Sequence, residues 1–250
     1  MVSATLNEFL NNQRSKVAAA IDLLPDGIGL DQLDRVLLGS DFVADQLNRH
    51  PDIISQIVLS DGGYAPGVLT ESVEQLVKEV ETEEQLSQVL RVVRRREMVR
   101  IIWRDLNRLA DLSETTRVLS ELADATTHAA LSWLHRDLAI DLGEPMNSQG
   151  EKQRMAVIGM GKLGANELNL SSDIDLIFTF PENGETVGGR RSLSNREFFT
   201  RLGKRLIRVL DAPTADGFVF RVDMRLRPFG SSGPLVASFD AMEQYYQTQG

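Results

Sequence analysis

Glycine divides the chain into two parts of different character. Of the 19 glycines among 250 residues, six fall in residues 1–142 and thirteen fall in residues 143–250. Glycine destabilises helix interiors and is favoured in tight turns. The first part is therefore expected to be helical, and the second to contain strands and turns. This contrast predicts an α+β chain, with a helical domain over 1–150 and a second domain over 151–250.

Apolar residues in the first part recur with helical spacing. Thr82 and Gln85 can form a capping box before a long amphipathic helix that continues to Leu106. Ser113 is expected to cap a second long helix, which Gly143 would end. Two long helices therefore dominate the prediction for this part.

Shorter segments complete the first part. Helices are expected over 3–24 and 40–48, and a His-Pro pair interrupts the helical pattern after the second of them. The stretch 144–153, EPMNSQGEKQ, is polar and has no periodicity. We therefore expect it to be a linker between the two domains.

Short apolar runs in the second part predict strands. They cover Met155–Gly159, Ile174–Phe180 and Phe218–Leu226, whereas Phe198–Leu210 has helical spacing. The order strand, turn, strand, helix, strand indicates an α/β or α+β unit. The stretch from Ser238 to Gly250 has a helical pattern without a clear end. The second domain is therefore expected to be incomplete at its C-terminus.

Composition excludes several classes of protein. The chain has no cysteine, which rules out disulfides, thiolate metal sites and cysteine nucleophiles. Its formal net charge of −9 argues against a general nucleic-acid binder. No apolar run approaches the roughly 18 residues of a membrane span, and the N-terminus has no signal-peptide pattern. We expect a cytoplasmic protein whose partners are neither nucleic acid nor a membrane.

A glycine-rich loop, GMGKLG, occupies residues 159–164 directly after a predicted strand. The spacing G-x-G-x-x-G is that of dinucleotide-binding folds, in which a crossover helix of about a dozen residues or more follows. Only residues 165–172 separate this loop from the next predicted strand, which argues against such a helix. Two interpretations remain: a tight turn without a ligand, or a loop that cradles a phosphate with Lys162 nearby.

Two aspartates begin the second predicted strand. Side chains alternate along a strand, so Asp173 and Asp175 are expected on one face. Hard divalent cations such as Mg²⁺ take oxygen ligands and are commonly shared with substrate phosphates. The pair therefore indicates a metal site, and the alternative is a strand end with two solvated acids.

The third predicted strand adds charged residues of both signs. Alternation places Asp223 on one face with Arg221, Arg225 and Arg227. If this strand lies beside the Asp173 strand, Asp223 completes a cluster of three carboxylates, which can hold two metal ions. Arg225 and Arg227 would then bind phosphate oxygens, or would form ion pairs with the same aspartates.

These motifs in this order resemble the nucleotidyltransferase superfamily of the DNA polymerase β type. Long stretches are similar to the N-terminal half of the bacterial glutamine synthetase adenylyltransferase family: GMGKLGANELNLSSDIDLIF, RVVRRREMVRIIW, and the chain from GGRRSLSNREFF onward. The resemblance is dense over 154–250 and looser before residue 90. It implies a helical domain followed by a polymerase-β-like core with a small mixed sheet.

The resemblance also implies an activity. Members of that family carry two similar nucleotidyltransferase domains, and the C-terminal one transfers AMP from ATP to a tyrosine of glutamine synthetase. The N-terminal one removes the AMP by phosphorolysis, with inorganic phosphate as co-substrate and ADP as product. The ELNLSSDIDL context and the start at Met1 resemble the removing domain. The alternatives are the transferring activity, or a regulatory module that holds nucleotide without turnover.

Site residues follow from the same resemblance. Asp173, Asp175 and Asp223 match the catalytic carboxylates that hold Mg²⁺ or Mn²⁺. The residues that match the loop near the nucleotide phosphates are Gly161, Lys162, Gly164 and Ser172. Family members act on adenylylated glutamine synthetase, and the full-length enzyme responds to the PII signalling protein.

One further motif, Arg94-Arg95-Arg96, lies on the first long predicted helix. On a helix these side chains point in different directions, and Arg91 and Arg95 share a face. The motif is either a solvated or acid-paired face, or a docking surface that faces the active site or glutamine synthetase.

Overall fold

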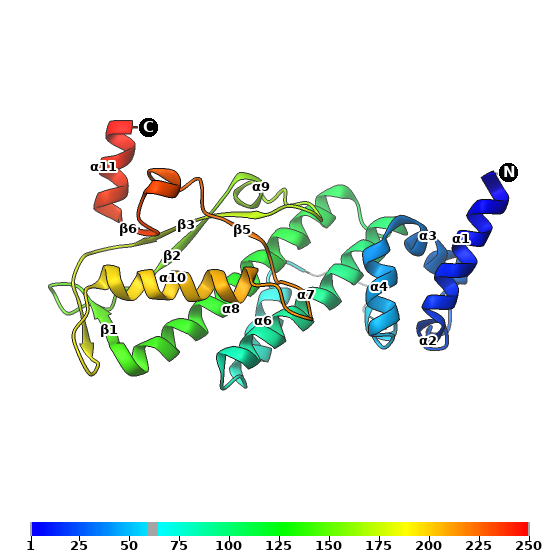
Figure 1. Cartoon of the computed structure of the whole chain (residues 1–250), viewed down its shortest axis with the longest axis horizontal. Coiled ribbons are helices and arrows are strands. Elements are labelled where there is room, and N and C mark those ends of the chain that lie inside the picture. Colours follow the sequence, from blue (N-terminus) through cyan, green and yellow to red (C-terminus); the bar gives the residue numbers. More distant parts are fainter. Residues whose placement is uncertain (1, 60–64, 250) are drawn as a thin grey trace.

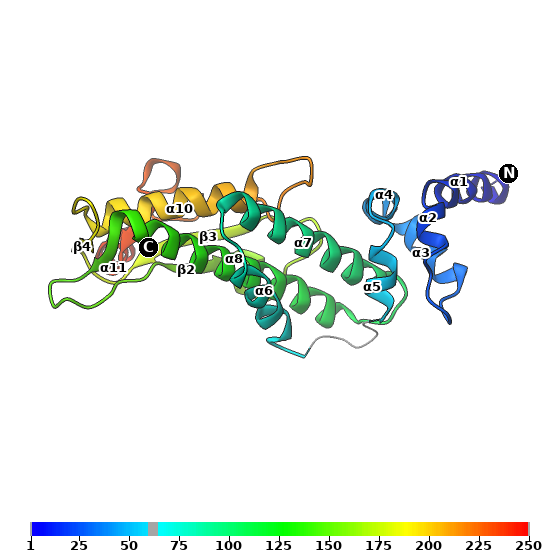
Figure 2. The same cartoon turned by 90° about the horizontal axis from the view of Figure 1, so that it is seen from below.

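The computed structural model describes residues 2–59 and 65–249, and helices make up its first half (Figure 1). The short N-terminal helices lie at one end of an elongated molecule, and the strands lie toward the other end (Figure 2). The helices of this half are α1 (Val2–Lys16), α2 (Ala18–Ile21), α3 (Leu30–Gly39), α4 (Asp41–Arg49), α5 (Ile53–Leu59), α6 (Val68–Lys78), α7 (Glu83–Leu106) and α8 (Leu112–Leu142).

The two long helices begin at side-chain caps. Thr82 and Gln85 form the predicted capping box at the start of α7. The cap of α8 is Asp111, whose carboxylate accepts a hydrogen bond from the Glu114 amide, so the expectation of Ser113 was wrong. Ser113 lies inside the first turn, because Asp111 already satisfies one of the amides exposed at the helix start. Gly143 ends α8 as predicted, with φ of 83°.

The shorter helices match the predictions less closely. The expected helix over 3–24 is two helices, α1 and α2, which meet at the buried Val17. Val17 has non-helical backbone angles, φ −104° and ψ 23°, and interrupts the helical pattern. The helix expected over 40–48 is α4, and the Ser40 side chain caps it by accepting a hydrogen bond from the Val43 amide.

The main sheet has four strands within the described residues, and one of them pairs with the other three. Central β3 (Ile174–Phe180) pairs antiparallel with β2 (Ala156–Met160) along one edge. Its other edge pairs parallel with β5 (Val222–Asp223) and, further along, with β6 (Val236–Ser238). The remaining elements are the short helix α9 (Gly161–Gly164), the long helix α10 (Asn195–Asp211), the 3₁₀ turn η1 (Gly230–Ser232) and the C-terminal helix α11 (Phe239–Gln249).

The direction of β2 decides against a dinucleotide-binding fold. That fold needs two parallel strands joined by a crossover helix, whereas β2 and β3 are antiparallel and are joined through the four-residue α9. The expected α+β class with a small mixed sheet is confirmed. The predicted strand at Ile174–Phe180 has the observed bounds, and the helix Phe198–Leu210 lies within α10. The outer limits of the two expected domains, Met1 and Gly250, lie outside the described residues.

The expectation of a linker over 144–153 was wrong. Its first residues belong to β1 (Gly143–Met146), which pairs antiparallel with β4 (Glu185–Gly188) in a second, two-stranded sheet. The Asn147 side chain then closes a turn by accepting hydrogen bonds from the amides of Gln149 and Glu151. The polar composition of this stretch reflects a half-exposed edge and a turn rather than an unstructured connection.

The predicted strand Phe218–Leu226 was too long. Only Val222 and Asp223 form β5, because the chain turns directly afterward. The Asp223 carboxylate accepts a hydrogen bond from the Arg225 amide, and the Arg227 amide donates to the Met224 carbonyl. The alternation of apolar residues therefore ends early, and Leu226 is half exposed.

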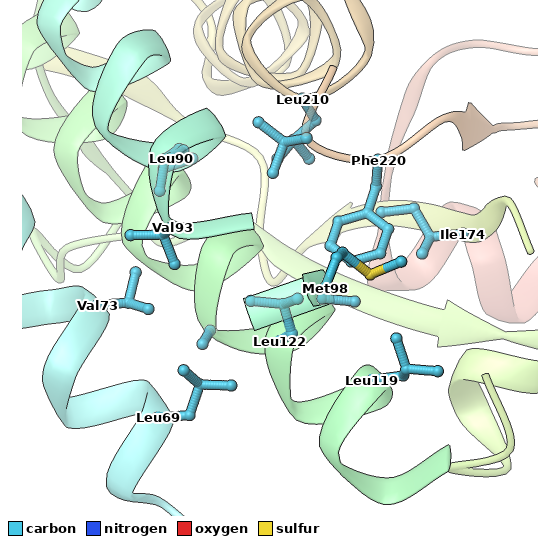
Figure 3. Close-up of a cluster of buried hydrophobic side chains, with 14 of the residues drawn as sticks. Leu69, Val73, Leu90, Val93, Met98, Leu119, Leu122, Ile174, Leu210 and Phe220 are labelled. Atoms are coloured by element: carbon cyan, nitrogen blue, oxygen red, sulfur yellow. The ribbon is translucent and has the colours of Figure 1, made fainter. Parts of the chain in front are cut away.

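Buried apolar side chains connect the helices to the sheet. Ile174 of β3 and Phe220, just before β5, lie close to Met98 of α7, Leu119 of α8 and Leu210 of α10 (Figure 3). This packing fixes one face of β3 against the helices, and on the opposite face Ile177 and Thr179 are also buried, so Asp175 is the one residue of β3 that is partly exposed. Within residues 2–59 and 65–249, no helix is both long and apolar enough to cross a membrane.

Candidate active site

Asp175 and Asp223 lie next to each other on neighbouring strands. The parallel pairing of β3 and β5 puts Asp175 in register with Asp223, and Ile174 in register with Val222. Since paired residues of adjacent strands point to the same face, the two carboxylates share the face opposite the buried Ile174. The sequence prediction that a later strand adds an acid to this face is confirmed for this pair.

Asp175 is a carboxylate without a neutralising partner. In the described part of the chain, no hydrogen bond or ion pair reaches its oxygens, although its side chain is partly buried. Burial raises the pKa of Asp175, the negative charges of Asp223 and Asp173 raise it further, and the positive charge of Arg225 opposes them. A partly buried acid whose pKa is raised by burial and by neighbouring acids is a candidate functional residue.

The two other acids are each paired with an arginine. The Asp223 carboxylate accepts hydrogen bonds from the Arg225 amide at 2.8 Å and from its Nε at 2.7 Å, which lowers the pKa of Asp223. Asp173, directly before β3, accepts from Nε of Arg221. Arg221 also donates from Nη2 to the Ser171 carbonyl at 2.7 Å. The contact of Arg225 is the ion pair that the sequence left open for this arginine.

The three acids therefore lie in the same part of the sheet, but their carboxylates do not meet at one point. Among the described residues, no group of three or more acidic, histidine or cysteine side chains is arranged to hold a metal ion together. Asp175 and Asp223 are in register, whereas Asp173 is engaged by Arg221. The Asp173 side chain is 47% exposed, so it lies at the open side of the site.

The glycine loop packs directly on Asp175. Gly161 begins α9 with φ of 54°, a left-handed conformation that favours glycine. Gly164 approaches Gly159 so closely that a β-carbon there would lie 2.5 Å from the Gly159 carbonyl oxygen. Lys162, between them, is exposed. The loop thus places Gly161 against the Asp175 side chain, and Lys162 is the exposed residue that follows it.

Ser172 and Arg227 are engaged in local turns. The Ser172 hydroxyl donates to Oδ1 of Asn169 at 2.7 Å, and this amide oxygen also accepts from the Ser171 amide. Arg227 donates from Nη1 to the Met224 carbonyl at 2.6 Å, and its Nε is buried without a hydrogen-bond partner among the described residues. Arg227 thus braces the turn after β5 rather than contacting the acids.

Sequence reasoning missed the contacts of Arg221 and Asn169. Strand alternation placed Arg221 on the face of the acids, but it gave no reason to pair Arg221 with Asp173 rather than with Asp223. The signal for Asn169 was available in the sequence, because asparagine two residues before a serine commonly closes a turn of this kind.

A cleft of about 790 Å³ lies elsewhere on the sheet. Helices α6 and α8 and strand β2 line it, and Leu176 contributes from the face of β3 opposite Asp175. None of the three acids borders this cleft, which reaches the glycine loop only at Gly159 and Leu163. The carboxylate site is therefore an open surface and not this cavity.

Comparison with known proteins places the chain in a family. The model of the glutamate-ammonia ligase adenylyltransferase family matches residues 30–250. The chain belongs to this family. The adenylyltransferase model covers the α7 arginines, the glycine loop and all three acids.

Curated relatives from three bacteria carry the name bifunctional glutamine synthetase adenylyltransferase/adenylyl-removing enzyme. The chain is 55% identical to the Pseudomonas aeruginosa protein over 225 residues, 53% to that of Pseudomonas putida over 223 and 49% to that of Shewanella oneidensis over 220. Each match covers 88% of this chain but only 23% of the relative. The chain thus spans about a quarter of the length of these adenylyltransferases.

Proposed function

We propose that this chain removes AMP from a tyrosine of adenylylated glutamine synthetase by phosphorolysis. The observation that carries the proposal is the in-register pair of Asp175 and Asp223 beside the glycine loop. The choice of removal over transfer rests on the resemblance of the ELNLSSDIDL segment to the removing domain. The proposal includes a cytoplasmic location and, through the complete protein, control by PII, both of which rest on the family resemblance.

The donor set fits a divalent cation. Asp175 offers carboxylate oxygens that no other described group neutralises, and Asp223 and Asp173 offer oxygens within the same neighbourhood. Hard oxygen ligands favour Mg²⁺ or Mn²⁺. Such an ion, when bound, supplies positive charge to the phosphoryl oxygens and to the leaving tyrosyl oxygen.

The arginines of the site supply anion-binding groups. Arg225 is 79% exposed and Arg221 is 53% exposed, so both guanidinium groups can exchange a carboxylate for a phosphate oxygen. Lys162 adds a third positive charge at the glycine loop. Together these residues attract inorganic phosphate to a site that the aspartates alone would repel.

The reaction exchanges one phosphate ester for a phosphoanhydride. An oxygen of inorganic phosphate forms a bond to the adenylyl phosphorus, and the bond from that phosphorus to the tyrosyl oxygen breaks. The tyrosyl oxygen takes a proton, and the products are ADP and unmodified tyrosine. A phenol with pKa near 10 is a moderate leaving group, which positive charge at the site improves.

The test identifies the product released from glutamine synthetase labelled in its AMP group. The complete gene product is incubated with this substrate, Mg²⁺ and phosphate, and the labelled nucleotide is separated. Phosphate-dependent formation of ADP is expected. Release of AMP without need for phosphate would overturn the phosphorolytic proposal. In a second incubation with labelled ATP and unmodified glutamine synthetase, a transfer of label that Asp175→Asn abolishes, with no ADP formed in the first incubation, would show that this site transfers AMP.

A further inference from the structure

Strand β5 is too short to fix its own position. It consists of Val222 and Asp223 only, and its ladder with β3 is supplemented by one hydrogen bond from the Ile174 amide to the Arg221 carbonyl at 2.9 Å. A strand that slips by one residue turns every side chain to the other face. The pairing of Asp175 with Asp223 therefore needs support from outside the sheet.

Arg91 of α7 reaches the segment that leads into β5. Its side chain is buried, with 2% of the residue exposed. Its Nε donates to the Gly217 carbonyl at 2.8 Å, and its Nη2 donates to the Ala212 carbonyl. Its Nη1 is held by the Ser87 carbonyl one helical turn earlier, at 2.9 Å. One guanidinium thus fixes both ends of the turn over 212–217 relative to α7.

Two further arginines on the same helix contact the same segment. The guanidinium of Arg94 lies over the Phe218 ring at 4.7 Å and near the Phe220 ring at 6.0 Å. Arg95 forms an ion pair with Asp216 at 3.1 Å. Residues 91, 94 and 95 have the spacing of one helix face. The chain between α10 and β5, coloured orange, passes beside α7 (Figure 1).

We propose that Arg91, supported by Arg94 and Arg95, is a positioning residue that sets the register of β5 on β3. Arg91 holds Ala212 and Gly217, and Arg94 and Arg95 contact residues within 216–220. This segment leads directly to Arg221, which pairs with Asp173, and to Asp223, which lies beside Asp175. These three arginines of α7 therefore contact a segment of this chain that leads to the site, and they do not form a docking surface for another protein. The consequence for turnover rests on the proposed function, whereas the consequence for strand register does not.

Amide hydrogen exchange at Ile174 tests the register directly, because this amide donates to the Arg221 carbonyl. Arg91→Met keeps the bulk of the side chain and removes its donors, and Arg91→Lys keeps one charged donor group. Arg205→Met is the matched control. Arg205 ties α10 to Glu83 of α7 and Asp137 of α8 and forms no hydrogen bond or ion pair with residues 212–221.

In the full chain, Arg91→Met is expected to speed exchange at Ile174 about tenfold relative to the core amides of α8, the effect of losing one or two hydrogen bonds. Arg91→Lys should give a smaller increase, and Arg205→Met should leave the ratio unchanged. If the ratio of the Ile174 exchange rate to that of the α8 core amides is the same in Arg91→Met as in the wild type, the proposal is wrong. If that variant does not fold, an unchanged ratio in Arg91→Lys would overturn it equally.

Turnover provides the second readout. In the complete gene product, Arg91→Met should lower kcat for AMP release by about tenfold or more while KM for adenylylated glutamine synthetase changes little, and Arg91→Lys should recover part of kcat. A loss of kcat equal to that of Arg205→Met, at equal Tm, would contradict a positioning role. If the wild type releases no ADP, the proposed function is wrong. The ratio of exchange rates at Ile174 and in α8 then still tests whether Arg91 sets the register of β5.

Discussion

A β-carbon on Gly161 would lie 2.6 Å from Oδ2 of Asp175. The glycine loop and the central aspartate are therefore in contact through a position that accepts no side chain. The left-handed φ of 54° at Gly161 imposes the same requirement independently. Loop and carboxylate thus form one unit, although fourteen positions separate them in the sequence.

Gly161→Ala is predicted to displace Asp175 and to lower AMP release by about tenfold or more, since small misplacements of reacting groups are costly. Gly150→Ala is the control, because Gly150 also has a positive φ, of 80°, but a β-carbon there has no neighbour within 4 Å. The control should lose about 1 kcal/mol of stability and keep wild-type turnover. Equal turnover in both variants would show that the conformation of the glycine loop does not affect the reaction at Asp175.

Asp175→Asn and Asp223→Asn are predicted to change stability in opposite directions. The pKa of Asp175 is raised, so its ionised form destabilises the fold at neutral pH, and its replacement should raise Tm by about 1–2 °C. The pKa of Asp223 is lowered by Arg225, so its ionised form stabilises the fold, and its replacement should lower Tm.

The pH dependence of these two effects follows from the same shifts. The gain in Asp175→Asn should shrink as the pH falls through the pKa of Asp175, because wild-type Asp175 then becomes neutral. The loss in Asp223→Asn should shrink as the pH falls through the lowered pKa of Asp223. Thermal unfolding from pH 7 to pH 3 measures both, and shifts of the same sign would contradict the assigned environments.

His135 is predicted to weaken the fold under mild acid. Burial lowers its pKa, the bond to Glu144 at 3.1 Å opposes this, and the charge of Arg154 lowers the pKa again. Neutral His135 packs edge-on against Phe198 with ring centres 5.2 Å apart. Because the unfolded chain takes up the proton more readily, this stability is present above about pH 6.5 and is lost as the pH falls through the lowered pKa.

His135→Gln should therefore show a fall in Tm between pH 7 and pH 5 that is smaller than the wild-type fall by about 2 °C. His128→Gln serves as the control, because the His128 side chain is 61% exposed and its replacement disturbs no buried ring contact. Identical profiles for His135→Gln and wild type would show that His135 makes no contribution in this range.

Local patterns were enough to predict several elements. The bounds of β3 follow from a run of apolar residues between Asp173 and Pro181, and the cap of α7 follows from Thr82 and Gln85. The acid on β5 was also predicted, because alternation places Asp223 on a defined face. In each case the deciding residues lie within a few positions of one another.

The missed features depend on contacts between distant segments. Residues 143–146 become a strand because β4 pairs with them some forty positions later, which the polar composition of 144–153 does not reveal. Likewise, Arg91 binds the Gly217 carbonyl across 126 positions. A helical pattern shows that Arg91 and Arg95 share a face, but not which segment that face meets.

The most direct measurement compares phosphate-dependent ADP release by the wild-type gene product, Asp175→Asn and the exposed control Asp141→Asn. Wild-type release is expected in the control, and a loss of about 100-fold or more is expected in Asp175→Asn, the scale seen when an electrostatic group of a reaction site is removed. ADP release at the wild-type rate in Asp175→Asn would contradict the assignment of the reaction to this carboxylate pair.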